Sequence, residues 1–382
     1  MHNSTAPATP PGVKKPRQLS LKRKLLFTCI CMLAILLMCE AGLRVRAWIK
    51  YGSTNPDIDD SFVFLDDIGL TIPRPGYETH GRSASVKVNS LGFRGEEFTQ
   101  QKPVGTVRIV CLGASTTFCT GSSNATTWPQ LLEEQIRKKH PNGSWQVINA
   151  GVPGHTMSAI LKNLKHRVLP LDPDLVIFYE AQNQLAVDTA QLARDRGVIA
   201  ADERNISPTV AFLSHYSLLF NLGHKNLRIM AARNDSNQAK LNGLPPDLNK
   251  KYVESLAEIH SVLKGRGVPL VTSPFLVKFR RDQERSVQIA NADIAFFYMP
   301  WMSIDDLLDG VDAYNKGLVD YAKANGLPVV EETTSIPADG KHFVDCIHFA
   351  DAGNVIMANR FFTLLDQGGT LQRLMDTRQQ GK

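Results

Sequence analysis

Residues that can carry out hydrolytic chemistry follow the apolar segments of this sequence. Ser115 comes shortly after the apolar run 107–112, within RIVCLGASTTFCTG (108–121). Asp345 and His348 stand three residues apart in VDCIHF, near the C-terminus. A serine hydroxyl is a weak nucleophile that needs a base, and a carboxylate must orient that base. This combination predicts Ser115 as nucleophile, His348 as base and Asp345 as the group that orients His348.

Two further segments carry candidate groups for stabilising an oxyanion. Gly154 lies in NAGVPGHT after one apolar run, and Asn183 lies in YEAQNQ after the next. The backbone N–H groups of Ser115 and Gly154 and the side-chain amide of Asn183 would supply three donors. Taken singly, each residue has a plainer interpretation: Ser115 caps a helix, Asn183 belongs to a turn, and Gly154 adopts a positive φ. In the same way, Asp345 and His348 taken alone are surface loop residues.

The elements that must position these residues alternate along the chain. Short apolar runs predict buried strands at 107–112, 145–149, 173–179, 268–274 and 327–332. Amphipathic patterns predict helices at 127–140, 156–169, 250–267, 311–326 and 350–365. Alternation of this kind favours a parallel sheet with helices on both faces. The site of such a sheet lies beyond the carboxyl ends of its strands, where all the candidate residues fall.

Three segments do not fit the alternation. Residues 53–106 predict a small β-rich lead-in, and residues 185–246 predict a long insertion that is a candidate cap. Residues 279–310, with AFFYMPW inside, are a second candidate cover for the site. Within the lead-in, Arg94 is interpreted as half of a structural salt bridge, with anion binding as the alternative.

The N-terminal segment predicts a membrane anchor. Residues 1–24 hold six Lys and Arg and no acid, and the remaining 37 basic residues equal the 37 acidic ones. The folded part is therefore near neutral, which argues against a nucleic-acid partner. We predict a disordered cytoplasmic tail (1–24) and a single transmembrane helix (25–43) in the cell inner membrane. The positive-inside rule places the domain on the periplasmic or extracellular side, and a cleaved signal peptide is the competing interpretation.

The cysteines predict neither a disulfide framework nor a zinc site. The chain has six, of which only Cys111, Cys119 and Cys346 fall in the domain. Cys119 and Cys346 are close in sequence to members of the predicted triad. The sequence is compatible with a disulfide between them and with two free buried thiols.

The four stretches together resemble the blocks of the SGNH (GDSL) hydrolases, over residues 105–366. LGASTT contains Ser115, NAGVPGHT contains Gly154, AQNQ contains Asn183, and DCIH contains Asp345 and His348. The resemblance implies a three-layer α/β/α sandwich with a flavodoxin-like parallel sheet of about five strands, here assigned to residues 107–366. It also implies a Ser-His-Asp esterase with no metal or organic cofactor. The related Gly-x-Ser-x-Gly elbow is excluded because position 117 is threonine and Asp345 is so close to His348.

The sequence departs from the family pattern at the first and third blocks. Ala114 replaces the usual aspartate before the nucleophile, and Ala181 and Gln184 replace a glycine and an aspartate around Asn183. The geometry of the oxyanion site is therefore less securely predicted than the triad.

We interpret the chain as a membrane-anchored serine esterase that hydrolyses carboxylic esters. The substrate would be an ester-bearing small molecule, a lipid or an acylated glycan. One alternative is an O-acetyltransferase or acetylesterase that acts on a cell-surface or exported polysaccharide. The other is a non-catalytic binding protein that retains the fold. The sequence leaves the acyl chain, the alcohol and the oligomeric state open.

Overall fold

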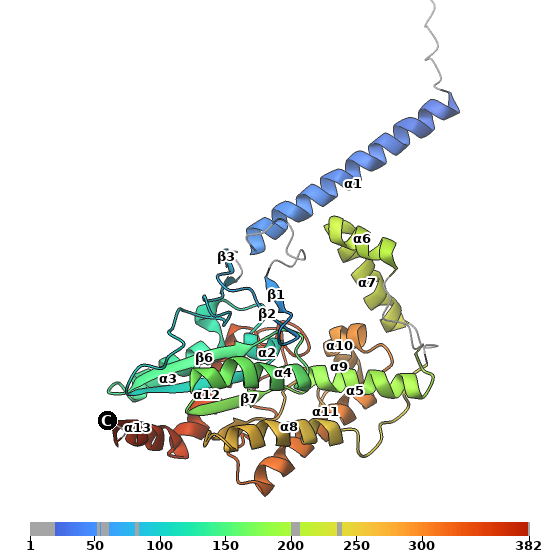
Figure 1. Cartoon of the computed structure of the whole chain (residues 1–382). Coiled ribbons are helices and arrows are strands. Elements are labelled where there is room, and N and C mark those ends of the chain that lie inside the picture. Colours follow the sequence, from blue (N-terminus) through green and yellow to red (C-terminus); the bar gives the residue numbers. More distant parts are fainter. Residues whose placement is uncertain are drawn as a thin grey trace, which may run out of the picture.

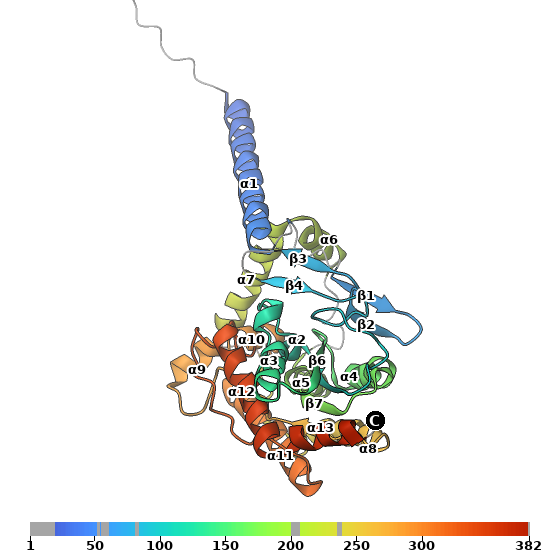
Figure 2. The same ribbon diagram turned by 90° about the vertical axis from the view of Figure 1, so that its left-hand side faces the viewer.

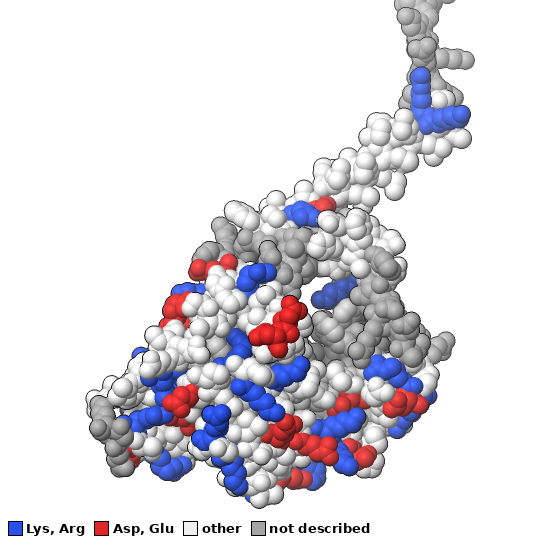
Figure 3. Space-filling view, viewed as in Figure 1, with Lys and Arg blue, Asp and Glu red and all other residues white. Residues whose placement is uncertain are grey.

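The computed structural model describes residues 20–51, 54, 61–80, 84–199, 207–234 and 239–380. A layered α/β body carries one long N-terminal helix, α1 (Leu21–Tyr51), which projects away from it (Figure 1). The predicted tail (1–24) lies mostly outside the described residues. Positive and negative side chains are interspersed over the visible face of the body (Figure 3).

The centre of the body is a parallel sheet with the strand order β6-β5-β7-β8. Its strands are β5 (Thr106–Gly113), β6 (Ser144–Gly151), β7 (Leu175–Tyr179) and β8 (Leu270–Thr272). Every residue of β5 and β7 is buried, as expected for central strands covered on both faces. The fifth predicted strand is reduced to a single parallel bridge between Thr272 and Val329. Pro328 precedes that bridge and has no N–H group to extend the ladder.

Helices cover both faces of the sheet, which confirms the predicted α/β sandwich (Figure 2). One group packs together beside β5 and β6: α3 (Trp128–Lys139), α12 (Asp351–Gln367) and α13 (Thr370–Gln380). The other group consists of α4 (Met157–Asn163), α5 (Gln182–Asp195), α8 (Lys250–Lys264) and α11 (Ile304–Ala324). The helix predicted at 156–169 is α-helical only to Asn163, because a π-turn (Leu164–Val168) and a 3-10 turn (Leu169–Leu171) follow.

The lead-in segment forms two antiparallel hairpins next to the sheet. They are β1 (Phe62–Leu65) with β2 (Leu70–Pro73), and β3 (Glu78–His80) with β4 (Ser85–Lys87). A bridge between Arg94 and Asn149 attaches the end of this segment to β6. The lead-in is therefore built onto the strand that precedes Gly154.

The segments predicted as covers are helical where they are described. Position 185 lies inside α5, and the insertion continues as α6 (Pro208–Tyr216) and α7 (Leu218–Asn234). The second segment contains α9 (Arg285–Asn291) and α10 (Asp293–Tyr298). Helix α7 packs against both α1 and α10, so the insertion joins the N-terminal helix to the body.

The N-terminal helix is longer than the predicted anchor (25–43). Its stretch Leu21–Ile49 contains an 18-residue window with a mean hydropathy of 2.3 and is long and apolar enough to cross a membrane. The apolar side chains of that window are exposed rather than packed against the body. This is the exposure that either a membrane anchor or a signal sequence would have.

Candidate active site

The three residues predicted as a triad form one hydrogen-bonded chain. His348 Nε2 lies 2.7 Å from Ser115 Oγ, and His348 Nδ1 lies 2.7 Å from Asp345 Oδ2. The second carboxylate oxygen, Asp345 Oδ1, accepts hydrogen bonds from the backbone N–H groups of Ile347 (2.9 Å) and His348 (2.8 Å). The side chains of His348 and Asp345 are 17% and 23% exposed, so both residues are partly accessible to solvent.

A short closed loop fixes the spacing between Asp345 and His348. An antiparallel bridge joins Phe343 to Phe349, and the N–H group of Val344 donates to the carbonyl of His348 at 2.8 Å. Both phenylalanines are buried, and the Phe349 ring stacks on Tyr179 at the end of β7. The loop is thus attached to the sheet edge by apolar packing.

The electrostatics of this loop favour an ionised Asp345. Burial by itself raises the pKa of the carboxyl group, but hydrogen bonds from the His348 ring and from two backbone N–H groups outweigh it. The pKa of Asp345 is consequently lowered from its ordinary value. The carboxylate can therefore stabilise a protonated His348 at neutral pH.

Ser115 stands at the first residue of a very tight turn after the central strand. It begins the short helix α2 (Ser115–Phe118), two residues after β5 ends at Gly113. A Cβ atom on Gly113 would lie 2.2 Å from Thr117 Oγ1 and 2.3 Å from the Tyr179 carbonyl oxygen. A Cβ atom on Gly151 would lie 2.3 Å from the backbone nitrogen of Phe118. Both glycines allow the turn that carries Ser115 to pack directly on the sheet.

Arg94 holds the far side of the same turn. Its guanidinium group donates to the carbonyls of Phe118 (2.6 Å), Cys119 (2.9 Å) and Ser122, and to Asn124 Oδ1 (3.0 Å). These partners are uncharged, so the predicted salt bridge is wrong: the arginine is buried against carbonyl oxygens. Burial lowers the pKa of Arg94 to about 10, and the group remains a cation at neutral pH.

The two predicted oxyanion residues lie at the neighbouring strand ends. In the sheet, β5 lies between β6 and β7. Ser115 therefore follows the middle strand of these three, and Gly154 and Asn183 follow the strands on either side of it. Gly154 has φ +79° in a turn closed by a hydrogen bond from the His155 N–H group to the Val152 carbonyl. Asn183 Nδ2 donates to the His155 carbonyl at 2.9 Å, which ties the two loops together. A side-chain amide carries two hydrogens, so this contact uses only one of them.

Glu180 is a functional candidate whose role the sequence did not reveal. It is buried at the end of β7, and its Oε1 accepts a hydrogen bond from the backbone N–H group of Asn183 at 2.7 Å. Gln184, at the position of the missing family aspartate, instead accepts from the N–H group of Met157 at 3.2 Å. Both contacts hold the Asn183 loop, so the altered third block is supported by other side chains.

Glu180 should make the stability of the protein depend on pH. Burial raises its pKa from 4.5 to about 8, although N–H groups of Asn183 and Ala181 lower it in part. The folded state thus holds a proton that the unfolded chain releases, and stability is lost as the pH rises through this range. We expect Glu180→Gln to remove this loss, so that its Tm exceeds the wild-type Tm increasingly as the pH rises towards 8.

Thermal unfolding of the full chain at several pH values measures this effect. The exposed carboxylate of Glu254, on α8, provides the matched control Glu254→Gln. A Tm difference for Glu180→Gln that stays constant with pH would show that the folded protein binds no extra proton there.

Other residues near the site have structural partners. His155 is buried with its Nε2 2.7 Å from the Thr71 carbonyl oxygen, and burial lowers its pKa to about 4. Cys119 and Cys346 are free, buried thiols, so the structure has no disulfide between them. Within the described part of the chain, no group of three or more His, Cys, Asp or Glu side chains could hold a metal ion.

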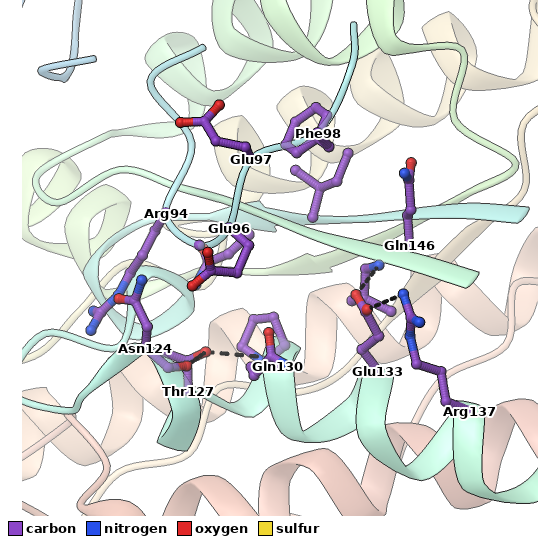
Figure 4. Close-up of a pocket in the computed structure, with 15 residues that line it drawn as sticks. Arg94, Glu96, Glu97, Phe98, Asn124, Thr127, Gln130, Glu133, Arg137 and Gln146 are labelled. Atoms are coloured by element: carbon purple, nitrogen blue, oxygen red, sulfur yellow. Dashed lines mark hydrogen bonds and ion pairs between the residues drawn. The ribbon is translucent and has the colours of Figure 1, made fainter. Parts of the chain in front are cut away.

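A polar cavity of about 440 Å³ lies away from the triad, between the lead-in, α3 and β6 (Figure 4). Glu96, Gln130, Glu133 and Arg137 are among its lining side chains. Arg137 pairs with Glu133 at 2.7 Å, and Glu133 also accepts from the Val147 N–H group at 2.7 Å. Ser115, Asp345 and His348 do not line this cavity.

Comparison with known proteins identifies the class to which this fold belongs. A family model described as GDSL-like lipase/acylhydrolase matches residues 111–356, which is more than half of the chain. The chain therefore belongs to the GDSL-like lipase/acylhydrolase family, and the predicted resemblance to SGNH hydrolases is confirmed. No curated protein matches the chain.

Similar solved structures share little sequence with this chain. One is LAE5, an alpha/beta hydrolase from the metagenome of Lake Arreo, with 14% identity and a TM-score of 0.40 over 68% of this chain and 94% of that one. Another is a catalytic mutant of Axe2, an acetylxylan esterase from Geobacillus stearothermophilus, with 13% identity and a TM-score of 0.41. The Axe2 match covers 69% of this chain and 96% of that chain.

Proposed function

We propose that this protein is a membrane-anchored serine esterase in which Ser115, His348 and Asp345 cleave a carboxylic ester. The observation that carries the proposal is the unbroken hydrogen-bonded chain from Asp345 through His348 to Ser115. A non-catalytic protein that merely retained the fold would not need to keep Ser115 Oγ within 2.7 Å of His348 Nε2. The geometry therefore favours an enzyme over a binding protein.

The reaction begins when Ser115 Oγ attacks the ester carbonyl carbon and His348 Nε2 takes the hydroxyl proton. Asp345 stabilises the resulting imidazolium ion. The tetrahedral intermediate collapses with cleavage of the bond to the alcohol oxygen, and His348 returns its proton to that oxygen. Water then attacks the acyl group on Ser115, with His348 as base, and releases the carboxylic acid.

The oxyanion of the intermediate would be held by the backbone N–H groups of Ser115 and Gly154 and by the amide of Asn183. The strand order supports this assignment. Ser115 follows β5, which lies between β6, the strand before Gly154, and β7, the strand before Asn183. The hydrogen bond from Asn183 Nδ2 to the His155 carbonyl fixes one amide hydrogen. It thereby sets the direction of the other hydrogen.

Replacement of Asn183 with alanine should lower kcat by about 10²–10³-fold, as for loss of one oxyanion donor elsewhere. The change in KM should be small, because the donor acts mainly on charge that develops in the transition state. Steady-state ester hydrolysis measures both constants. The control is Gln191→Ala, an exposed amide on the same helix. An unchanged kcat in Asn183→Ala would remove this residue from the oxyanion site.

The anchor is proposed from α1, whose exposed apolar stretch is long enough to cross a bilayer. Lys22, Arg23 and Lys24 precede the uncharged run Leu25–Cys39, which supports a cytoplasmic N-terminus and a domain on the extracytoplasmic side. Protease protection in sealed membrane vesicles tests this orientation. Release of a processed soluble domain would instead favour a signal sequence.

A second candidate function is transfer or removal of acetyl groups on a cell-surface or exported glycan. The partly exposed triad and the exposed Gly154 favour it, since a bulky sugar could reach Ser115 from solvent. A sugar hydroxyl would then replace water in the second step, or the sugar would be the alcohol released in the first.

The deciding experiment compares esters with the full chain in detergent micelles or nanodiscs. p-Nitrophenyl acetate, butyrate and octanoate report on chain length, and O-acetylated oligosaccharides report on sugar substrates. Addition of an unacetylated oligosaccharide, followed by mass spectrometry, detects transfer. Turnover of any ester supports the enzyme proposal, and failure with all of them would move the binding-protein alternative ahead.

A further inference from the structure

The turn between α6 and α7 is attached to the N-terminal helix by a side-chain cap. The carboxylate of Glu40, on α1, accepts hydrogen bonds from the backbone N–H groups of Leu218 (3.0 Å) and Leu219 (2.9 Å). It also accepts a hydrogen bond from the Ser217 hydroxyl at 3.0 Å. The two N–H groups belong to the first turn of α7, where they would otherwise have no partner within the helix. One position of α1 therefore fixes the height of the α6–α7 turn along that helix (Figures 1 and 2).

In a membrane crossed by α1, that height would fall close to the outer boundary of the hydrocarbon core. The uncharged run Leu25–Cys39 spans roughly 22 Å at 1.5 Å per residue, whereas a hydrocarbon core is about 30 Å thick. An α1 helix that fills the core from Leu25 onward extends to about Leu43, so Arg44 lies at the outer edge and Glu40 about one helical turn inside it. Arg44 donates to Glu40 at 2.8 Å and to the Tyr216 carbonyl at 3.0 Å, so both charges at this level are paired.

Helix α6 presents an apolar surface at the same level. It has no Lys, Arg, Asp or Glu, and its side chains Phe212 and Tyr216 are 61% and 60% exposed. Leu213 is also exposed, and the rings of Phe212 and Tyr216 lie 4.7 Å apart, forming a joint apolar patch. Figure 3 shows α1 free of charged side chains between the basic residues at its N-terminal end and the charged pair near the body. A surface of this kind beside a membrane helix fits acyl chains and headgroups.

We propose that α6 and the α6–α7 turn lie in the outer boundary of the lipid bilayer, as a second membrane contact beside α1. This inference rests on the proposed anchor role of α1. The partner is the lipid surface itself, because the turn beside the patch is bonded to Glu40 and Arg44 of α1, where the uncharged spanning run ends.

The second contact would fix how the active site faces the membrane. Helix α7 packs against α10, where Lys225 Nζ lies 5.8 Å from the centre of the Phe297 ring. The segment that leads into α9 and α10 contacts the loop of Asp345, because the Lys278 N–H group donates to the Cys346 carbonyl at 2.8 Å. A path of packed helices therefore runs from α1 through α7 to α10, which lies next to the loop of Asp345 and His348. A single spanning helix alone would leave the domain free to tilt.

Photo-crosslinking to lipid tests this contact in the full chain. Benzoylphenylalanine replaces Phe212 in protein reconstituted into vesicles of phosphatidylcholine and phosphatidylglycerol, and mass spectrometry detects lipid adducts after irradiation. The same group at Phe27, an exposed aromatic residue of α1, is the positive control. The same group at Val104, an exposed residue before β5, is the negative control.

Lipid adducts at positions 212 and 27, and none at 104, are the expected result. Adducts at 27 without adducts at 212 would overturn the second contact and leave the anchor standing. Adducts from 212 to another protein or to a second copy of this chain would overturn it in favour of a protein interface. Loss of adducts at both 27 and 212 would remove the anchor as well. None of these readouts needs Ser115, so they are independent of the proposed esterase activity.

Discussion

Replacement of Ser115 with alanine should lower kcat/KM for p-nitrophenyl acetate by about 10³-fold or more. The variant loses the oxygen that lies 2.7 Å from His348 Nε2 and that we propose becomes acylated. The remaining donors at Gly154 and Asn183 can still bind the ester, so a weak residual rate is expected. Release of p-nitrophenolate by the full chain measures the effect.

A matched control separates loss of the nucleophile from general damage. Ser261 is an exposed serine on α8, and Ser261→Ala should keep wild-type activity. A fluorophosphonate reagent should add its mass to Ser115 in the wild-type protein and in Ser261→Ala, and not in Ser115→Ala. Full activity in Ser115→Ala, or labelling of a different residue, would contradict the proposed nucleophile.

The hydrophobic pattern of the sequence could predict those elements whose residues are almost all buried. Strands β5 and β7 are buried along their whole length, so their apolar runs stand out in the sequence. Ser115 could be placed because it directly follows such a run. Asp345 and His348 could be paired because a spacing of three residues keeps both on one loop.

The parts that could not be predicted depend on contacts between distant segments. Arg94 lies 24 residues from Phe118 in the sequence, and its carbonyl partners have no side-chain signature. Glu180 was visible at a strand end, but its burial depends on helices that come much later, such as α8, whose Tyr252 hydroxyl donates to the Glu180 carbonyl. The unusual residues Ala181 and Gln184 indicated a weakened oxyanion loop, whereas Glu180 and Gln184 support it by contacts that no motif contains.

Replacement of Asp345 with asparagine should lower kcat by about 10⁴-fold, the scale seen when a triad carboxylate is made neutral. The geometry gives a specific reason. Asp345 Oδ1 accepts two backbone N–H groups, so the amide oxygen of asparagine must occupy that position. The amide nitrogen is then forced to face His348 Nδ1. His348 would donate from Nε2 towards Ser115 and could not accept its proton.

The comparison with Asp345→Ala tests this tautomer argument. Alanine also removes the carboxylate, but it places no amide donor against His348 Nδ1, so the ring can still take the productive tautomer. We therefore expect Asp345→Ala to retain more activity than Asp345→Asn, although the asparagine is the closer match in shape. The ring N–H signals of His348 in an NMR spectrum identify the tautomer directly. If Asp345→Asn were the more active variant, or its His348 carried the proton on Nδ1, the proposed role of Asp345 in orienting the base would be wrong.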